Sequence, residues 1–168
     1  MLEVATPCTP DDFDAVRQLA WAYRDFLASL PPPDNVVTTF AYDVDAYAAI
    51  LNQIDILHAP PRGALKLARL DGVAVGCGMM QTIAPGTAEV KRVYITESAR
   101  GTGAGRAIMG ALIEDARALG FQRIQLDTGR PLVAAQKLYL SLGFRERTPY
   151  WDPPADILDR LVFFQLDL

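Results

Sequence analysis

Hydrophobic residues near the start of the chain recur every three to four positions, which is the period of an amphipathic helix. This spacing runs through residues 9–30, where Thr9 suits an N-cap, Pro10 the first helical position and two aspartates the positive helix end. We expect a short strand over residues 2–5 before this helix. The predicted buried stripe of the helix consists of Phe13, Val16, Leu19, Ala20, Tyr23 and Leu27.

A second helical period covers residues 43–57 and lies between two proline-rich segments. Residues 31–35, PPPDN, end the first helix and begin a loop, and residues 59–63, APPRG, break the second helix. His58 stands next to this breaker, so we expect a surface or capping residue rather than a catalytic one. The first third of the chain is therefore predicted to be mainly helical.

The pattern then changes to that of strands. Residues 63–83 indicate two strands joined at Asp71 and Gly72, a dipeptide typical of tight hairpins, and residues 86–95 indicate a third. Simple alternation determines which side chains of this third strand share a face. It places Glu89, Lys91, Val93 and Ile95 on one face and Val90, Arg92 and Tyr94 on the other.

Helices and strands alternate in the second half. Helices are predicted over 104–120 and 131–143, and strands over 121–128, 144–148 and 160–168. The full order, β-α-α-β-β-β-α-β-α-β-β, contains no repeat or linker, so the whole chain, residues 1–168, is predicted to form one mixed α/β domain. The predicted buried stripe of the helix over 104–120 consists of Ala107, Ile108, Ala111, Leu112 and Leu119.

Composition argues against several classes of partner. The chain has 168 residues and a net charge of −4, so it lacks the basic surplus typical of nucleic-acid-binding domains. No apolar run reaches the roughly 18 residues of a membrane span, and the N-terminus lacks a signal-peptide pattern. We expect a cytoplasmic protein that binds neither nucleic acid nor membrane. Cys8 and Cys77 lack metal-ligand spacing, so free thiols and no metal site are predicted.

The stretch ARGTGAGRA, residues 99–107, places three glycines and two arginines between a predicted strand and a predicted helix. Glycines leave backbone N–H groups uncovered, and a helix start carries about half a positive charge, so the segment suits a phosphate group. Arg100 and Arg106 add cationic donors. A flexible turn is the alternative. A Walker loop is absent, and a dinucleotide fingerprint fits poorly, although Asp127 stands where a ribose-binding acid would.

Residues 100–105, RGTGAG, match the Q/R-x-x-G-x-G/A signature of the GNAT superfamily of N-acetyltransferases, which the chain resembles over most of its length. DGVAVGCG at 71–78 resembles its second and third strands, EVKRVYI at 89–95 its fourth strand, and AAQKLYLSLGF at 134–144 its motif B. The resemblance implies a mixed, mostly antiparallel sheet with a splayed central strand pair and flanking helices.

The resemblance also implies an N-acetyltransferase that uses acetyl-CoA as its co-substrate and needs no metal. In this superfamily the loop amides bind the CoA pyrophosphate, and the strand before the loop contacts the pantetheine and the acetyl carbonyl. Leu132 departs from the pattern, because an asparagine that contacts CoA commonly stands there. The cofactor-binding residues implied for this sequence are Val93, Tyr94, Ile95, Arg100, Gly101, Thr102, Gly103, Ala104, Gly105 and Arg106.

Acetyl transfer to an amine needs a neutral amine, a donor for the oxyanion and a proton for the departing thiolate. Tyr139 stands at the tyrosine position of motif B, which implies the general acid, and the alternative is a packing residue on the helix. Glu89 stands where the histone-acetyltransferase branch has its base. An ion pair with Lys91 or Arg92, or proton transfer through water chains alone, is the alternative for this residue.

The acceptor site in the superfamily is built by segments that correspond to residues 21–45 and 148–158. Tyr150 and Trp151 suit an ammonium group or plug the end of the sheet, whereas Arg92 or Lys91 would suit a carboxylate. The polar and aromatic candidates in the two segments are Tyr23, Asp25, Tyr42, Tyr150, Trp151 and Asp152.

These candidates predict a small-molecule acceptor with a primary amine, either an amino acid or a simpler amine. Two alternatives stay open, namely a protein or peptide acceptor and an acyl-CoA-binding sensor or partner module with little transfer activity. The apolar segment LVFFQL, residues 161–166, is either buried or part of a homodimer interface.

Overall fold

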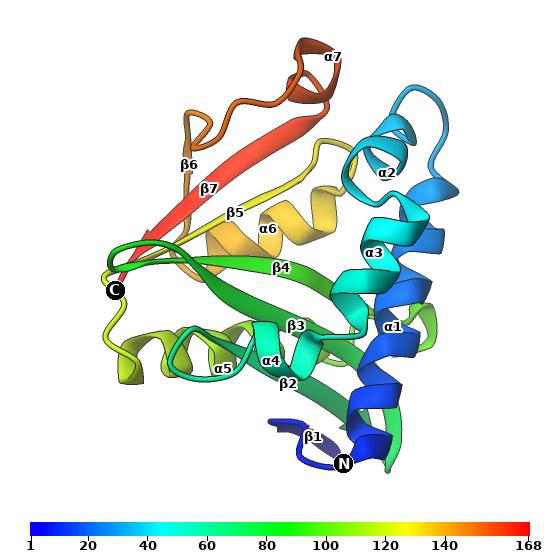
Figure 1. The fold of residues 1–168 in the computed structure, drawn as a ribbon, viewed down its shortest axis with the longest axis vertical. Coiled ribbons are helices and arrows are strands. Elements are labelled where there is room, and N and C mark those ends of the chain that lie inside the picture. The colour runs from blue at the N-terminus through cyan, green and yellow to red at the C-terminus, as the bar shows by residue number, and fades with distance from the viewer.

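A seven-stranded sheet forms the centre of the computed structural model, which describes residues 1–168 (Figure 1). The strands are β1 (Leu2–Ala5), β2 (Gly63–Leu70), β3 (Val73–Ala84), β4 (Thr87–Ile95), β5 (Arg123–Gly129), β6 (Arg145–Arg147) and β7 (Leu161–Asp167). Their spatial order is β1-β2-β3-β4-β5-β7-β6, and only the β4–β5 pair is parallel. The expected mixed, mostly antiparallel sheet is confirmed.

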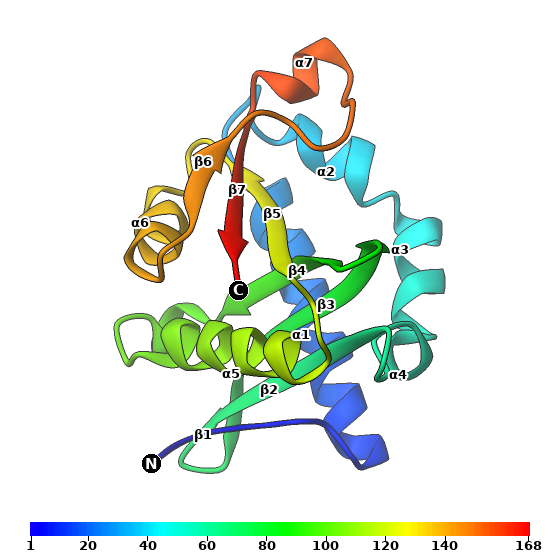
Figure 2. The ribbon, with the colours of Figure 1, turned by 90° about the vertical axis from the view of Figure 1, so that its left-hand side faces the viewer.

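Helices cover both faces of this sheet, with α5 and α6 on one side and α1 on the other (Figure 2). None of them combines the length and the apolar composition that a membrane crossing requires. The helices are α1 (Pro10–Ala28), α2 (Val36–Ala41), α3 (Val44–Leu51), α4 (Ile54–Leu57), α5 (Ala104–Ala118), α6 (Val133–Ser141) and α7 (Ala155–Leu158), and a 3-10 turn covers Glu97–Ala99.

The start of α1 follows the sequence prediction. Thr9 caps the helix by accepting a hydrogen bond from the Asp12 backbone N–H, and the Asp12 carboxylate accepts one from the Thr9 N–H in return. Backbone N–H groups of Cys8 and Thr9 therefore hold the pKa of Asp12 well below its usual range. Asp12 also pairs with Arg69 at 2.8 Å, which ties the helix start to β2.

Each face of the sheet carries its own hydrophobic cluster. Ile108 and Leu112 of α5 are fully buried, as predicted, whereas Ala107 and Ala111 are only half-buried. The helix packs so closely on β3 that a Cβ on Gly78 would lie 2.7 Å from Ile108. The prediction missed other buried positions of α5, namely Ala104, Met109, Ile113 and Ala116.

The predicted hairpin is present, because Asp71 and Gly72 both adopt positive φ angles of 50° and 82° between β2 and β3. The prediction of one helix over 43–57 was wrong, since the helix breaks at Asn52 and Gln53 into α3 and α4. Asparagine is a weak helix former, and the break lets Leu51 and Ile54 both reach the core.

Two further short helices, α2 and α7, lie in or beside segments predicted as loops. The segment of α2 is rich in valine and threonine, which favour helices weakly, so its helical form depends on packing against α1 and α7. The segment 161–166 lies within β7, between β5 and β6, and its first four residues are buried inside the chain. The interior prediction for this segment therefore holds.

The parallel pair β4–β5 is short. Only Thr87, Ala88 and Glu89 pair with β5, whose partners are residues 123–125, and beyond Glu89 the two strands separate. The splayed strand pair implied by the resemblance is thus confirmed. The edge of β4 that faces β5 has no strand partner after this point, so its backbone groups are open to other partners.

A β-bulge changes the faces of β4. Lys91 pairs with Met79 and Tyr94 pairs with Cys77, so β4 advances by three residues where β3 advances by only two. Within this bulge Arg92 adopts a φ of 53°. The predicted alternation is therefore wrong beyond Lys91. Val93 and Ile95 pack on the α5 side together with Val90, while Arg92 and Tyr94 face α1 on the side of Glu89.

His58 is 2% exposed, so the expectation of a surface residue was wrong, although it does cap α4. The carbonyl of Met80 accepts a hydrogen bond from its Nδ1 at 3.0 Å, and its Nε2 is buried without a partner. Burial, followed by the charges of Arg92 and Lys91, lowers the pKa of His58 to about 4. Cys8 and Cys77 are free thiols, as expected.

We predict that His58 makes the protein sensitive to acid. The unfolded chain takes up a proton near pH 6.5 and the folded chain only near pH 4, so stability falls as pH drops through this window. The loss amounts to about 3 kcal/mol for this group. In urea unfolding at pH 7, 5.5 and 4, His58→Asn, which keeps a donor toward Met80, should lose most of this slope. An unchanged slope would contradict the assignment.

Candidate functional site

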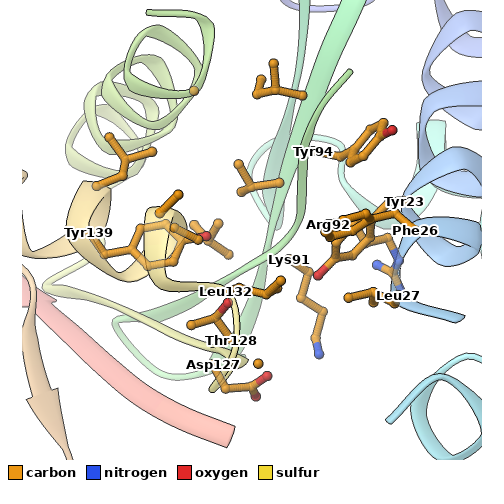
Figure 3. Close-up of a pocket in the computed structure, with 18 of the residues that line it drawn as sticks. Tyr23, Phe26, Leu27, Lys91, Arg92, Tyr94, Asp127, Thr128, Leu132 and Tyr139 are labelled. Atoms are coloured by element: carbon orange, nitrogen blue, oxygen red, sulfur yellow. The ribbon is translucent and has the colours of Figure 1, made fainter. Parts of the chain in front are cut away.

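The separation of β4 from β5 opens into a cavity of about 730 Å³ (Figure 3). Its walls come from α1, β4, the segment between β4 and α5, and the first turns of α6. Figure 3 shows Tyr139 entering from the α6 side, Tyr23 and Phe26 from α1, and Lys91 directed toward Asp127 at the lower end. Nine predicted cofactor-binding residues line this cavity: Val93, Tyr94, Ile95, Arg100, Gly101, Gly103, Ala104, Gly105 and Arg106.

The glycine-rich loop presents a group of uncovered backbone donors. Gly101 and Gly103 have φ angles of 82° and 89°, which only glycine adopts without strain, and α5 begins directly after Gly103. A Cβ on either glycine would meet nothing within 4 Å, so the space in front of the loop is open. The amides without an acceptor in the protein are those of Gly101, Gly103, Ala104, Gly105 and Arg106.

Three side chains of the loop are already engaged. The Arg100 guanidinium lies 5.2 Å from the centre of the Phe26 ring, and Arg106 donates to the Ser141 hydroxyl at 2.7 Å. Thr102 is the predicted residue that does not line the cavity, because its hydroxyl donates to the Ala99 carbonyl at 2.7 Å. Both arginines therefore stay at the rim of the cavity, beside the free amides.

Tyr139 is 6% exposed and packs against Phe144 and Phe164, so it fulfils the packing role that the sequence left open. Its hydroxyl nevertheless points into the cavity and makes no hydrogen bond with another residue. Burial raises the pKa of Tyr139, so the hydroxyl keeps its proton at neutral pH. The geometry leaves this proton available to a bound molecule.

Two carboxylates lie together at the other end of the cavity. Glu89 pairs with Gln125 across β4 and β5, and Asp127, two residues further along β5, shares that face. The Tyr150 hydroxyl donates to Glu89 at 2.7 Å and lies 3.3 Å from Asp127. Since a hydroxyl has one proton, the shorter contact assigns it to Glu89. The Trp151 indole N–H supplies Asp127 with a donor at 2.8 Å.

Lys91 partly balances these two charges. Its ammonium lies 3.3 Å from Glu89, which confirms the ion pair considered from sequence. Burial by itself would lower the pKa of Lys91, but Glu89, Tyr42 and Asp127 outweigh it and raise the pKa. Burial raises the pKa of Asp127, against the opposing effects of Lys91 and Trp151. The cluster therefore holds one cation, the buried carboxyl group of Glu89 and the half-buried carboxyl group of Asp127.

Arg92 points away from these carboxylates. It is 7% exposed, its guanidinium lies over the rings of Tyr47 and Tyr42 at 5.4 Å and 6.0 Å, and its Nε has no hydrogen-bond partner. The alternative ion pair between Glu89 and Arg92 is absent. The bulge explains this, because it places Arg92 beneath the aromatic residues that cover β3 and β4.

The acceptor candidates divide into two groups. Tyr23, Tyr42 and Tyr150 line the cavity, whereas Asp25 and Asp152 are exposed and line no part of it. Asp127, which the sequence suggested only as a ribose-binding acid, is a member of the carboxylate cluster. The sequence did contain a signal for this role of Asp127. Gln125 and Asp127 are polar residues two positions apart in a mostly buried strand, so their side chains share a face and indicate a polar site there. No three His, Cys, Asp or Glu side chains are arranged to hold a metal.

The splayed sheet with a glycine-rich helix start beside it defines a GNAT-type fold. The acetyltransferase (GNAT) family model matches residues 14–144. An uncharacterised N-acetyltransferase of Schizosaccharomyces pombe is 32% identical over 113 residues, which cover 66% of this chain and 68% of that protein. The chain belongs to the GNAT family, and it is therefore an acetyltransferase.

Solved structures agree in fold. An acetyltransferase of the GNAT family from Staphylococcus aureus superposes with a TM-score of 0.77 at 16% identity, covering 99% of both chains. An N-acetyltransferase of Thermoplasma acidophilum, solved in complex with coenzyme A, superposes with a TM-score of 0.71 at 13% identity, covering 100% of this chain and 99% of that chain. At these identities the likeness concerns the fold alone.

We predict that Tyr150→Phe destabilises the protein more at pH 8 than at pH 5. The change removes the donor to Glu89 and the polar hydroxyl 3.3 Å from Asp127, which raises the pKa of Asp127 further, so the folded state favours the protonated acid. The free energy of unfolding should fall by about 1–2 kcal/mol at pH 8. Urea titrations at both pH values test this.

Tyr23→Phe is the matched control for this measurement. Tyr23 lines the same cavity, but its hydroxyl makes no hydrogen bond with the protein. Its removal should have the same small effect at both pH values. An equal loss for Tyr150→Phe at pH 5 and pH 8 would contradict the shared role of its hydroxyl.

Proposed function

We propose that the protein transfers an acetyl group from acetyl-CoA to the primary amine of a small molecule. One observation carries this proposal: a single cavity joins the free loop amides at one end to Tyr139 and the carboxyl groups of Glu89 and Asp127 at the other. Family membership supplies the reaction type, and the coenzyme A complex of the Thermoplasma acidophilum protein supports the choice of donor.

The residues present fit the donor. The pyrophosphate of CoA would bind the amides of the loop and the start of α5, with Arg100 and Arg106 at the rim. The open edge of β4 at Val93, Tyr94 and Ile95 would accept the amide groups of the pantetheine chain, because the β5-facing edge has no strand partner beyond Glu89. These roles follow from exposed backbone groups, so they need no particular side chain.

Leu132 changes the chemistry of one wall. It lies just before α6, lines the cavity, and makes no side-chain cap for the helix. It contacts Gly129, where a Cβ would lie 3.5 Å from the leucine side chain. A polar contact to CoA from this position is therefore replaced by apolar surface, and the affinity for the donor rests on the loop and on β4.

The proposed reaction needs a proton transfer from Tyr139 and another to Glu89. The amine nitrogen attacks the acetyl carbonyl carbon, the carbon–sulfur bond breaks, and the sulfur leaves as a thiolate. Tyr139 donates its hydroxyl proton to this sulfur, since the hydroxyl points into the cavity and is protonated at neutral pH. The ammonium gives one proton to Glu89, directly or through water, before the attack, and the proton that the nitrogen loses after the attack restores the Tyr139 hydroxyl.

A small acceptor suits the dimensions of the site. Glu89 is 6% exposed and lies beneath Tyr150 and Lys91, so a reacting amine must enter an enclosed space rather than approach on an open surface. The same cavity of about 730 Å³ must also admit the acetyl end of the donor. These limits favour a small molecule over a folded protein.

We predict that acetyl-CoA raises the melting temperature. A ligand at about 100 times its Kd adds about 2.7 kcal/mol, or roughly 5–10 °C for a chain of this size. Gly103→Ala should lose most of this rise, because its Cβ stands before the free amides. Gly72→Ala is the matched control: its φ of 82° imposes similar strain, also in open space, but in a hairpin outside the cavity. Equal shifts in both variants would exclude the loop as the binding site.

We predict that Tyr139→Phe lowers kcat by about 100-fold, the scale of general acid catalysis, and leaves the affinity for acetyl-CoA unchanged. The phenyl ring keeps its packing against Phe144 and Phe164, so the fold should survive. Release of free CoA thiol measures turnover, and the acetyl-CoA melting shift serves as the internal control. Undiminished turnover would show that the sulfur receives its proton from another donor.

A further inference from the structure

A second, smaller pocket of about 280 Å³ meets the main cavity at the carboxylate cluster. Six residues line both pockets and form the junction between them, and its charged members are Glu89, Lys91 and Asp127, beside Val37, Tyr42 and Leu161. The outer wall of the smaller pocket is apolar and aromatic. Phe40 of α2 and Trp151 lie nearly parallel, at 7° with ring centres 6.4 Å apart, and Phe40 is 48% exposed at the mouth.

We propose that the acceptor enters through this second pocket, and that it is an arylalkylamine: a primary ammonium carried on a short chain with one aromatic ring and no carboxylate. This proposal rests on the proposed acetyl transfer and names the substrate class of that site. Trp151 and Phe40 bind the ring, and Asp127 binds the ammonium. The sequence offered Trp151 as an apolar wall or an ammonium contact of the acceptor site, and it assigned no acceptor role to Phe40 or Asp127.

Asp127 has one carboxylate oxygen free for a ligand. Its Oδ2 receives the Trp151 indole N–H at 2.8 Å and lies 3.3 Å from the Tyr150 hydroxyl, while its Oδ1 accepts no hydrogen bond from the protein. With Glu89 and Asp127 ionised and Lys91 protonated, the junction carries a net charge of −1. Asp127 is half-buried, and an unpartnered acceptor atom that faces a negative site favours a cation with N–H donors, which a protonated amine supplies.

The position of Asp127 also orders the events. The ammonium first binds at Asp127. Glu89 lies on the neighbouring strand β4, at the entrance to the main cavity, and accepts a hydrogen bond from the Tyr150 hydroxyl at 2.7 Å. Loss of a proton to Glu89 then yields the neutral amine beside the donor. Asp127 is therefore a binding residue for the ammonium, distinct from the base.

The same charges exclude amino acids. A carboxylate on the acceptor would lie near Glu89 and Asp127, and Lys91 is already paired with Glu89 at 3.3 Å. Arg92 lines the main cavity but not the smaller pocket, and its guanidinium is already engaged over Tyr42 and Tyr47. An acceptor carboxylate would be buried without a counter-charge, which is strongly unfavourable.

The apolar wall of the smaller pocket limits the size of the acceptor's aromatic end. The remaining lining around Phe40 and Trp151 consists of Val37, Ala41, Tyr42, Ile157 and Leu161. The volume lies just below the range of about 300–1,000 Å³ that holds drug-sized ligands, so it suits a single ring system. Trp151 is fixed by its hydrogen bond to Asp127, so the ring site and the ammonium site move as one unit.

Three amines test the substrate class with the wild-type protein: phenethylamine, phenylalanine and ethylamine. Phenethylamine should show the highest kcat/KM. Phenylalanine, which adds only a carboxylate, should be at least 100-fold worse, and ethylamine, which lacks the ring, about 10- to 100-fold worse. Turnover of phenylalanine equal to that of phenethylamine would overturn the proposal.

Three variants test the residues. Asp127→Asn should raise the KM for phenethylamine about 10- to 100-fold and keep the acetyl-CoA melting shift, while Asp156→Asn, an exposed acid on α7, should change neither. Trp151→Leu should lower kcat/KM for phenethylamine much more than for ethylamine. An unchanged KM in Asp127→Asn, with acetyl-CoA bound and another amine acetylated, would overturn this inference alone. Absence of acetyl-CoA binding in the wild type would instead overturn the proposed function.

Discussion

The separation of β4 from β5 after Glu89 is the constraint on which the rest of the structure depends. A parallel pair that continued would satisfy the backbone of both strands and leave no space between them. Because pairing between β4 and β5 stops at Glu89, the two strand edges that face each other beyond this point are unpaired, and the cavity lies between them. The helices α5 and α6 start at this opening, so their N-terminal amides face the same space.

The charged residues at the opening follow from the same geometry. Glu89 is the last residue of β4 that pairs with β5, and Asp127 is the first acidic residue of β5 beyond that paired segment. The negative charges of two neighbouring carboxyl groups repel each other. Lys91 offsets this repulsion with its positive charge, and Tyr150 and Trp151 offset it by donating hydrogen bonds. The last two of these residues come from the segment between β6 and β7, so the site is complete only when the C-terminal strands are in place.

Local patterns predicted much of this structure. The cap of α1, the hairpin at Asp71 and Gly72, and the glycine-rich start of α5 are set by neighbouring residues, so the sequence alone was sufficient. The bulge at Arg92 was missed because alternation assumes a regular strand, and nothing in the residue types marks the extra position. His58 was missed for a different reason: its burial depends on strand β3, more than twenty residues away.

Contacts distant in sequence account for the remainder of the site. The hydrogen bond from Trp151 to Asp127 joins residues 24 positions apart, and that from Tyr150 to Glu89 joins residues 61 positions apart. Motifs could suggest Tyr139 and Glu89 because a family resemblance carries such positions. The pairing of Asp127 with Trp151 required the three-dimensional arrangement, since neither residue belongs to a recognised motif.

The contact between Arg100 and Phe26 links two parts of the protein that are expected to vary for different reasons. In the proposed reaction the loop binds the donor, whereas α1 leads into the segment that would border the acceptor. A substitution on α1 that reshapes the acceptor side can therefore shift Arg100 and alter how the loop is held. Specificity for one substrate is thus not free to evolve independently of affinity for the other, and Phe26 is the point at which the two are coupled.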